Sequence, residues 1–305
     1  MKKLMVISFL CIFGSALFGQ NQLNLTQYMI HQPAINFASI AANDALNIAG
    51  IHREQWVGFE GAPSSSIFSI NTPIGLTNLS FGSLLRYERI GVHAITRAEA
   101  GLAYRAQVSS ESFLSFCLTG GIINMNSDYS KLTLYDLNDP EFPNTSISEI
   151  QPDFGFSTYL FAQNYYFGLA IPSLLRNTGF YTDKELLFMP LDFHYYTTAG
   201  YQRPLNDNFD LGLSTLIKGV IGSPLQFDLN LQAFYNDQFG LGTSFRSSMD
   251  FAFIATFKLL DRFTVSYSYD LGISELARFH NNTHEIMLIF DAPKRNLLPF
   301  TSPRF

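Results

Sequence analysis

Residues that could bind a metal lie close together near the end of the chain, at His280, His284 and Glu285. Histidine nitrogens and carboxylate oxygens are ligands that bind zinc in proteins. If this segment is a β-strand, however, His284 and Glu285 point to opposite faces, because successive side chains of a strand alternate. We therefore favour ordinary polar roles for these residues over a metal site.

Acidic residues gather in one stretch in the middle of the chain, where their oxygens could bind calcium. No loop of the D-x-D-x-D-G type accompanies them, so a solvated acidic loop is the favoured interpretation. These residues are Asp128, Asp136, Asp139, Glu141 and Glu149.

Serine, histidine and acidic residues are all present, so a hydrolase is formally possible. No G-x-S-x-G motif places a nucleophile on a strand-to-helix turn. No candidate nucleophile and base are separated by a sequence spacing typical of a known catalytic motif. We expect no enzymatic activity and no cofactor.

The elements that must position these residues are strands with a strict two-residue period. In residues 225–235 the apolar parity holds Leu225, Phe227, Leu229, Leu231, Ala233 and Tyr235, and the other parity holds Gln226, Asp228, Asn230 and Gln232. The same pattern recurs in residues 209–218 and 263–271. Each repeat has roughly the ten residues that a tilted strand needs to cross a bilayer.

The composition agrees with a transmembrane β-barrel. Charged residues make up only 14% of the chain, against about 25% in ordinary soluble domains. After the N-terminus, no apolar run approaches the roughly 20 residues of a membrane helix. In a barrel only half of the residues meet lipid, which reconciles low charge with a mean hydropathy of only +0.09.

The alternation predicts an all-β transmembrane antiparallel β-barrel of about fourteen strands, an even number as in bacterial single-chain barrels. The predicted strands are 45–57, 64–72, 78–88, 93–106, 111–125, 151–161, 163–171, 193–204, 207–218, 224–235, 237–247, 249–259, 261–272 and 281–291.

The connections between these strands alternate between short turns and longer loops, as expected of inner turns and outer loops. The two longest, residues 126–150 and 172–192, fall on the same side, together with 273–280. We expect these loops to face the cell exterior. Protease added to intact cells should cut residues 126–150 or 172–192, and cleavage only after the outer membrane is opened would invert this topology.

The N-terminus has the features of a secretory signal peptide. Lys2 and Lys3 precede an apolar run, and small residues follow before Gln20. The predicted organisation is a signal peptide at 1–19, a periplasmic or plug segment at 20–44, the barrel at 45–291 and a periplasmic tail at 292–305. Removal of the signal peptide leaves Cys117 alone, so no internal disulfide is expected.

The formal net charge of −6, without a basic cluster, excludes nucleic acid as a partner. The expected surroundings are the lipid bilayer of the outer membrane, and the expected location is integral to it.

Several short motifs together resemble one known family. They are Gln27-Tyr28-Met29, Arg53-Glu54-Gln55-Trp56-Val57-Gly58-Phe59, Gly61-Ala62-Pro63-Ser64, Tyr267-Ser268-Tyr269-Asp270, Thr283-His284-Glu285-Ile286-Met287-Leu288 and Ser302-Pro303-Arg304-Phe305. In this order they resemble the PorP/SprF family of outer-membrane proteins associated with type IX secretion in Bacteroidetes. The departures are Asn36-Phe37-Ala38 and Ala41, where the family tends to have Asn-Pro-Ala with a Gly shortly after, and Thr283, where it usually has Ser.

The resemblance implies a barrel that cooperates with the type IX machinery. In several members it holds or helps export a large secreted surface protein through the C-terminal domain of that cargo. The implied partners are the cargo and other type IX components.

Strand parity places a set of polar residues on the inward face of the predicted barrel: Arg53, Gln55, Asp228, Asp270 and Glu285. They could contact a partner in the lumen, but we favour Arg53 as one half of an ion pair across the wall. Trp56, Tyr235 and Tyr267 are expected in the interfacial aromatic girdles.

The first and last strands must pair, because a barrel has no open edge in lipid. Arg53 and Glu285 each lie four residues from the outer end of their predicted strands and share the inward parity. We therefore predict that they form a lumen-side ion pair at this seam, and that Glu285→Ala destabilises the barrel more than the double change with Arg53→Ala.

Fourteen strands enclose more volume than the eight-stranded barrels that side chains alone can fill, so something must occupy or cross the lumen. Inward Ser, Gly, Thr and Asn with few charges suit a packed segment better than a charge-selective pore. A secretion-linked partner barrel is the leading hypothesis, and an outer-membrane channel for small solutes is the alternative.

Overall fold

The computed structural model describes residues 24–131, 146–175, 181–182, 185–186, 193–220, 223–248, 250–260, 262–273 and 281–292. The predicted signal peptide (1–19) and almost all of the predicted tail (292–305) lie outside these residues. So do His280, Asp136, Asp139 and Glu141.

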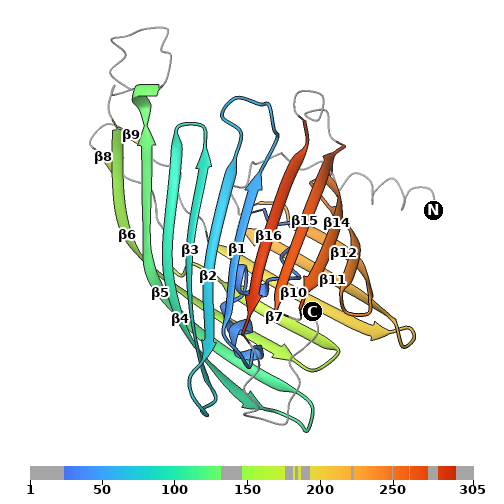
Figure 1. Ribbon diagram of the computed structural model, residues 1–305. Coiled ribbons are helices and arrows are strands. Elements are labelled where there is room, and N and C mark those ends of the chain that lie inside the picture. The colour runs from blue at the N-terminus through green and yellow to red at the C-terminus, as the bar shows by residue number, and fades with distance from the viewer. Residues whose placement is uncertain are drawn as a thin grey trace, which may run out of the picture.

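Fourteen antiparallel strands form a closed barrel in which each strand pairs with its neighbours along the chain and β1 pairs with β16 (Figure 1). This confirms the predicted fold and strand number. The strands are β1 (Asn47–Glu54), β2 (Ser64–Pro73), β3 (Leu79–Ile90), β4 (His93–Gln107), β5 (Phe113–Asp128), β6 (Ser146–Phe161), β7 (Tyr165–Ile171), β10 (His194–Pro204), β11 (Phe209–Val220), β12 (Gln226–Tyr235), β13 (Phe239–Arg246), β14 (Asp250–Leu259), β15 (Phe263–Gly272) and β16 (Thr283–Asp291). A separate two-stranded sheet consists of β8 (Tyr181–Thr182) and β9 (Glu185–Leu186).

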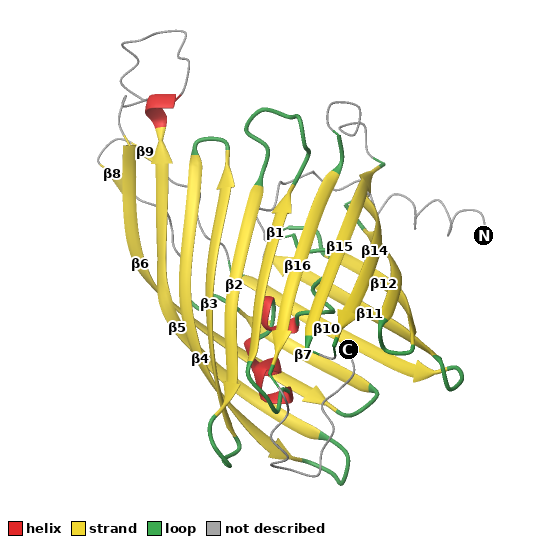
Figure 2. Ribbon diagram, in the orientation of Figure 1, coloured by secondary structure: helices red, strands yellow, loops and turns green. Residues whose placement is uncertain are grey.

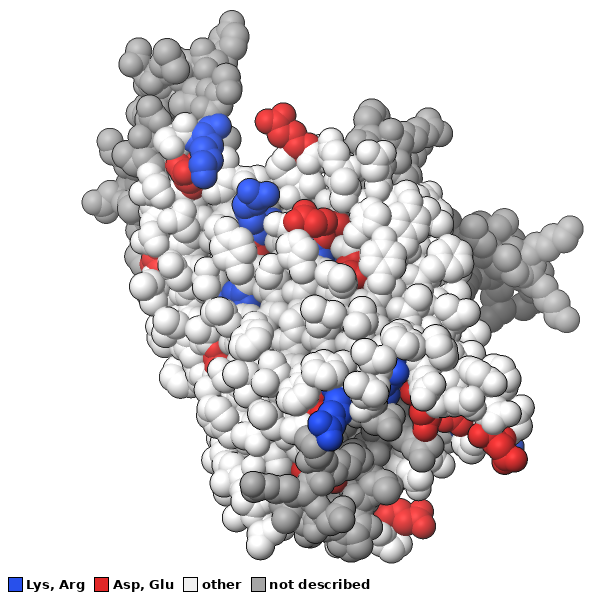
Figure 3. All heavy atoms as spheres, viewed as in Figure 1, with Lys and Arg blue, Asp and Glu red and all other residues white. Residues whose placement is uncertain are grey.

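Alternation of side chains is clear in β12. Leu229 and Leu231 are exposed on the outward face, whereas Asp228 and Asn230 are buried. The outward face is rich in exposed aromatic and aliphatic side chains, and the middle of the face in Figure 3 carries few charged atoms. This is the surface that a hydrocarbon environment favours.

Three strand predictions differ from the structure by three or more residues at their outer ends. The strand predicted at 45–57 ends at Glu54, because the chain turns at Trp56, whose φ is +49°. The strands predicted at 111–125 and 151–161 continue further outward, since β5 and β6 stay paired up to Asp128 and Ser146.

We call the end of the barrel that carries the β1–β2 loop the outer end, and the opposite end the inner end. The inner turns are short, as the strand bounds show, and both β5 and β6 extend furthest toward the outer end (Figure 2). None of the helices in the described residues has the length and apolarity required to cross a membrane.

The interior of the barrel, its lumen, holds residues 24–44, which we call the lumen segment. It contains two short 3-10 helices, η1 (Gln32–Ala34) and η2 (Phe37–Ala42), and a third, η3 (Tyr129–Lys131), lies after β5. Tyr28, Ala38 and Ile40 of the lumen segment are fully buried, and they pack with wall residues such as Leu84 in one hydrophobic core. Residues 24–44, the described part of the segment predicted at 20–44, are thus largely buried against the inner face of the wall.

Candidate functional site

Six buried charged side chains, on β1, β11, β12, β13, β15 and β16, lie together in the outer half of the lumen, and we call them the lumen cluster. All are at most 3% exposed. Three are basic and three are acidic, so their formal charges cancel. Burying charges is unfavourable unless they are paired and hydrogen-bonded. The members are Arg53, Lys218, Asp228, Arg246, Asp270 and Glu285.

Arg53 bridges two carboxylates from the two strands that follow it around the barrel. Its Nη2 lies 2.7 Å from Asp270 Oδ2 on β15, and its Nη1 lies 3.0 Å from Glu285 Oε2 on β16. Arg53 and Glu285 are directly opposite in the β1–β16 ladder. The ion pair predicted at the seam is therefore present, and Asp270 is a second partner that the prediction did not include.

Glu285 also binds the main chain of the lumen segment. Its two carboxylate oxygens accept hydrogen bonds of 2.9 Å from the backbone N–H groups of Thr26 and Gln27. The Thr26 hydroxyl donates to Asp270 Oδ2 at 2.6 Å. The seam between the first and last strands is thus bound to the lumen segment as well as to itself.

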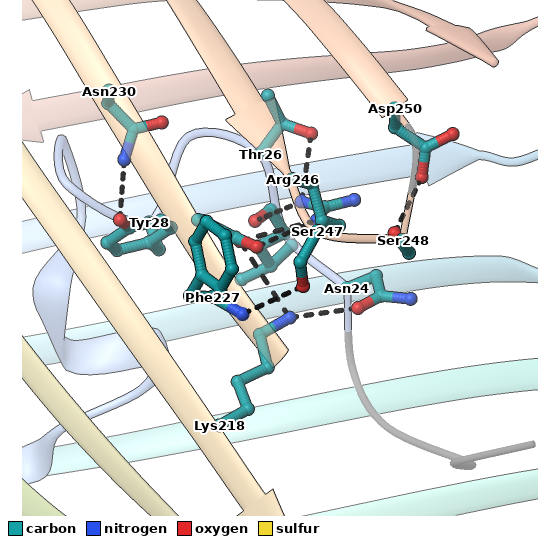
Figure 4. Close-up of polar contacts among 12 residues, drawn as sticks. Asn24, Thr26, Tyr28, Lys218, Phe227, Asn230, Arg246, Ser247, Ser248 and Asp250 are labelled. Atoms are coloured by element: carbon teal, nitrogen blue, oxygen red, sulfur yellow. Dashed lines mark hydrogen bonds and ion pairs between the residues drawn. The ribbon is translucent and has the colours of Figure 1, made fainter. Parts of the chain in front are cut away.

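Asp228 organises the other half of the cluster, on β11, β12 and β13. Arg246 Nε lies 3.2 Å from Asp228 Oδ1, and Arg246 Nη2 donates to the Leu25 carbonyl oxygen at 3.1 Å. Lys218 Nζ donates to Asn24 Oδ1 at 2.8 Å and lies 4.0 Å from Asp228 Oδ2. Figure 4 shows Lys218 and Arg246 near Asn24 and Thr26, at the start of the lumen segment.

The inner half of the lumen segment meets a different part of the wall. The Asn36 side chain accepts from the N–H of Ala38 and so caps η2, while its Nδ2 donates to the Thr158 carbonyl oxygen. Ser115 Oγ donates to the Ala38 carbonyl oxygen at 2.7 Å, and Arg105 Nη1 donates to the Ala41 carbonyl oxygen at 3.1 Å.

Glycines in the wall leave room for this inner half. A Cβ atom placed on Gly168 of β7 would lie 2.5 Å from Asn36 Nδ2, and one on Gly101 of β4 would lie 2.9 Å from the Phe37 ring. Separations this short would force the neighbours to move. The wall is therefore shaped to the lumen segment as well as hydrogen-bonded to it.

His31 of the lumen segment is 2% exposed, and its Nε2 lies 2.8 Å from Ser69 Oγ on β2. Burial lowers the pKa of His31 from its usual value of 6.5 to about 4. The docked segment therefore holds this imidazole neutral, whereas a released segment would take up a proton below pH 6.5.

Docking of the lumen segment should weaken as the pH falls from about 6.5 to 4, because protonation favours the released form. At pH 5 the expected loss is about 2 kcal/mol. The measurement is the midpoint of thermal unfolding at pH 7.5 and pH 5, followed by the mobility shift of the heated barrel in electrophoresis. His31→Gln should reduce the difference between the two midpoints, and an unchanged difference would contradict this origin.

The structure brings together four of the five predicted inward residues, since Arg53, Asp270, Glu285 and Asp228 all belong to the lumen cluster. Gln55, the fifth, is not part of the first strand, and its inward orientation stays a prediction. It lies beyond the end of β1, where its backbone N–H donates to the Pro63 carbonyl oxygen.

The three predicted girdle residues are exposed, Trp56 to 36%, Tyr235 to 43% and Tyr267 to 42%. Their place in an interfacial girdle stays a prediction. His284 and Glu285 do face opposite ways, because Glu285 is buried whereas His284 Nδ1 bonds the hydroxyl of the outward Tyr267. The described residues contain no group of three side chains placed to bind a metal ion.

Sequence reasoning missed Thr26, Gln27, Lys218 and Arg246. Lys218 on β11 and Arg246 on β13 occupy inward positions of their strands, as Asp228 does on β12. The alternation of apolar and polar residues could therefore have identified both of them as inward. Thr26 and Gln27 precede all strands, and no periodicity indicates their position.

A closed barrel with an apolar outward face and a polar lumen defines the class of outer-membrane β-barrel proteins. The family model for the type IX secretion system membrane protein PorP/SprF matches residues 17–290, and the chain belongs to this family.

Among solved structures, the outer membrane protein Omp33 of Acinetobacter baumannii is similar with a TM-score of 0.48 and 7% identity, over 81% of this chain and 98% of that chain. A FadL homologue of Pseudomonas aeruginosa has a TM-score of 0.47 and 11% identity, over 85% of this chain and 92% of that chain. No match was found among curated proteins.

Proposed function

We propose that this barrel is a partner of the type IX secretion system that holds or helps export a large secreted surface protein, through the C-terminal domain of that cargo. Membership in the PorP/SprF family supports the link to type IX secretion. The protein acts in this proposal by binding its cargo and other type IX components, without catalysing a reaction.

The observation that carries the proposal is the occupied lumen. The lumen segment is buried along most of its length and is fixed to the wall on several strands. A barrel whose interior is filled by its own chain is better suited to present a binding surface than to pass solutes. The runner-up function is a channel for small solutes, which would require the segment to move.

Deletion of the gene should leave solute uptake intact and stop one large secreted protein from reaching the cell surface. The measurement is a comparison of surface proteins between wild-type and deletion cells. A pull-down of the barrel from outer membranes should recover the same protein together with type IX components.

The channel hypothesis makes the opposite prediction for the purified protein. In planar bilayers the wild-type barrel should remain closed, because the lumen segment fills it. A steady, large conductance, together with normal surface proteins in the deletion strain, would favour the solute channel.

A further inference from the structure

The lumen segment leaves part of the lumen open on one side. Its helix η2 packs against β2 to β7. On the opposite side, a cavity of about 580 Å³ lies between the segment and the strands β10, β12 and β14 to β16, and it reaches the β12–β13 turn at the inner end. We call it the inner cavity. Six wall residues that line it are Gln202, Phe234, Thr256, Thr264, Ile289 and Asp291.

Two features of the chain account for the position of the inner cavity. Gly212 of β11, which is paired with Gln232 of β12, contributes no side chain, and a Cβ atom placed there would lie 3.9 Å from the nearest atom of another strand. Further toward the outer end, Asn230 Nδ2 donates to the hydroxyl of the fully buried Tyr28. The cavity therefore lies between this contact and the inner turns.

Acidic side chains surround the mouth of the inner cavity. Besides Asp44, four aspartates line the cavity or the groove over the β10–β11 turn that adjoins it: Asp207, Asp210, Asp237 and Asp291. Among the described residues that line the two, Lys258 is the one basic residue. Figure 3 shows acidic atoms gathered at this end of the molecule, at the lower right. The mouth therefore attracts a positively charged ligand.

The hydrogen bonds of these carboxylates leave their charge in place. Asp210 Oδ2 accepts from Gln202 Nε2 at 3.2 Å, and Asp291 Oδ1 accepts from Asn47 Nδ2 at 2.8 Å. Both donors are neutral amides, so they contribute no positive charge. A cationic side chain at the mouth would form charge-assisted hydrogen bonds, which are the stronger kind.

Asp44 of the lumen segment also lines the inner cavity. Its Oδ1 lies 2.9 Å from Arg105 Nη1, and this ion pair ties the segment to β4. Its Oδ2 is buried and accepts no hydrogen bond from a described residue. Because buried polar atoms are normally hydrogen-bonded, Asp44 has the capacity for one more donor.

Apolar side chains form another part of the lining. Met29 and Ile30 of the lumen segment line the inner cavity together with Phe234 of β12 and Ile289 of β16. Burial of apolar side chains against them is favourable by about 25 cal/mol per Å² of surface removed from water. A ligand that fits the inner cavity therefore combines positive charge with apolar side chains.

The chain itself has this composition where it leaves the last strand. β16 ends one residue before Ala292, which lines the inner cavity. Residues 293–305, which lie outside the described part of the chain, hold three basic residues and no acidic residue. Two of the basic residues, Lys294 and Arg295, shortly precede the apolar stretch 297–300.

We propose that residues 293–300 dock in the inner cavity of the same molecule. Lys294 and Arg295 contact the aspartates at the mouth, and the apolar side chains of residues 297–300 contact the apolar lining. Because the segment is tethered at the cavity, its high local concentration favours docking even where the contacts are weak. Residues 24–44 keep their place in this arrangement, since the cavity lies beside them.

Disulfide cross-linking in the full-length protein tests this docking. Cys117→Ala removes the buried thiol of β5. Leu298→Cys is then combined with either Thr256→Cys or Thr77→Cys. Thr256 lines the inner cavity and Thr77 is exposed in the β2–β3 turn, and both lie two strands from β16 around the barrel. We expect the pair with Thr256→Cys to oxidise at least about tenfold faster, because docking raises the local concentration of the two thiols.

Two arginines provide a matched test of the charge contribution. Arg295→Glu places a negative charge among the aspartates of the mouth and should slow the cross-link between positions 298 and 256 by about fivefold or more. Arg304→Glu makes the same change outside the docked segment and should leave the rate unchanged. The mobility shift on heating verifies that each variant is a folded barrel.

Three results would overturn the proposal. The first is an equal or faster cross-link to Thr77→Cys, which would show that the segment does not occupy the cavity. The second is a disulfide between two chains, seen as a dimer in non-reducing electrophoresis, because the occupant would then come from another copy. The third is an equal effect of Arg295→Glu and Arg304→Glu. None of them depends on the role of the barrel in secretion, which the deletion strain tests separately.

Discussion

Replacing Arg53 with alanine should destabilise the barrel by about 3–5 kcal/mol, the cost of leaving a buried charge without its partner. Arg53 neutralises both Asp270 and Glu285, whose side chains are 4% and 0% exposed. Its loss leaves two neighbouring carboxylates that repel each other at the seam between β1 and β15–β16.

The measurement is unfolding in urea or by heat, followed by the mobility shift of the barrel in electrophoresis. Glu54→Ala is the matched control, because Glu54 is the next residue of β1 and its exposed carboxylate lies 3.0 Å from His52 Nε2. Pairs of this kind contribute about 0–1 kcal/mol. Equal effects of the two substitutions would show that Arg53 does not stabilise the seam.

The second partner of Arg53 changes one expectation. The sequence alone predicted that adding Arg53→Ala would relieve the effect of Glu285→Ala. The double variant would now leave Asp270 without Arg53, and the N–H groups of Thr26 and Gln27 without Glu285. We therefore expect the double variant to be less stable than Glu285→Ala alone.

Gly168→Ala should displace the inner half of the lumen segment and open the barrel. The added Cβ would lie 2.5 Å from Asn36 Nδ2 and 2.6 Å from Thr198 Oγ1, so the Asn36 amide must leave its bond to the Thr158 carbonyl oxygen. Overpacking of this kind costs about 1–3 kcal/mol, which shifts the equilibrium between docked and released segment by roughly 5- to 150-fold.

Single-channel recording in planar bilayers measures this effect as opening events that the wild type lacks. Gly50→Ala is the control, since a Cβ on this residue of β1 would have no neighbour within 4 Å. It should remain as closed as the wild type. A closed Gly168→Ala barrel with unchanged thermal stability would show that the wall yields without moving the segment.

The strands could be predicted because two physical requirements act on the sequence together. One face of each strand must be apolar, which gives the two-residue period of Leu229 and Leu231, and the strand must be long enough to cross the bilayer. Both requirements are local, so they can be read without knowing which strand pairs with which. The end of β1 was misplaced because the alternation continues past Glu54 although the chain turns at Trp56.

The lumen segment and most of the lumen cluster could not be predicted in the same way. Residues 24–44 follow no period, because they pack on all sides inside a closed wall. The contact between Arg53 and Glu285 was within reach, since both lie on the strands that must pair. Asp270 was identified as inward, but its bond to Arg53 depends on the stagger of β15 against β1, which the alternation does not contain.

The backbone bonds from Thr26 and Gln27 to Glu285 join positions 259 and 258 residues apart in the chain. The donors precede every described strand in the chain, and the acceptor lies on β16, the last of these strands. A nascent or truncated chain that lacks β16 has no acceptor for these two donors. The lumen segment can therefore be anchored at Thr26 and Gln27 only once β16 has taken its place in the barrel.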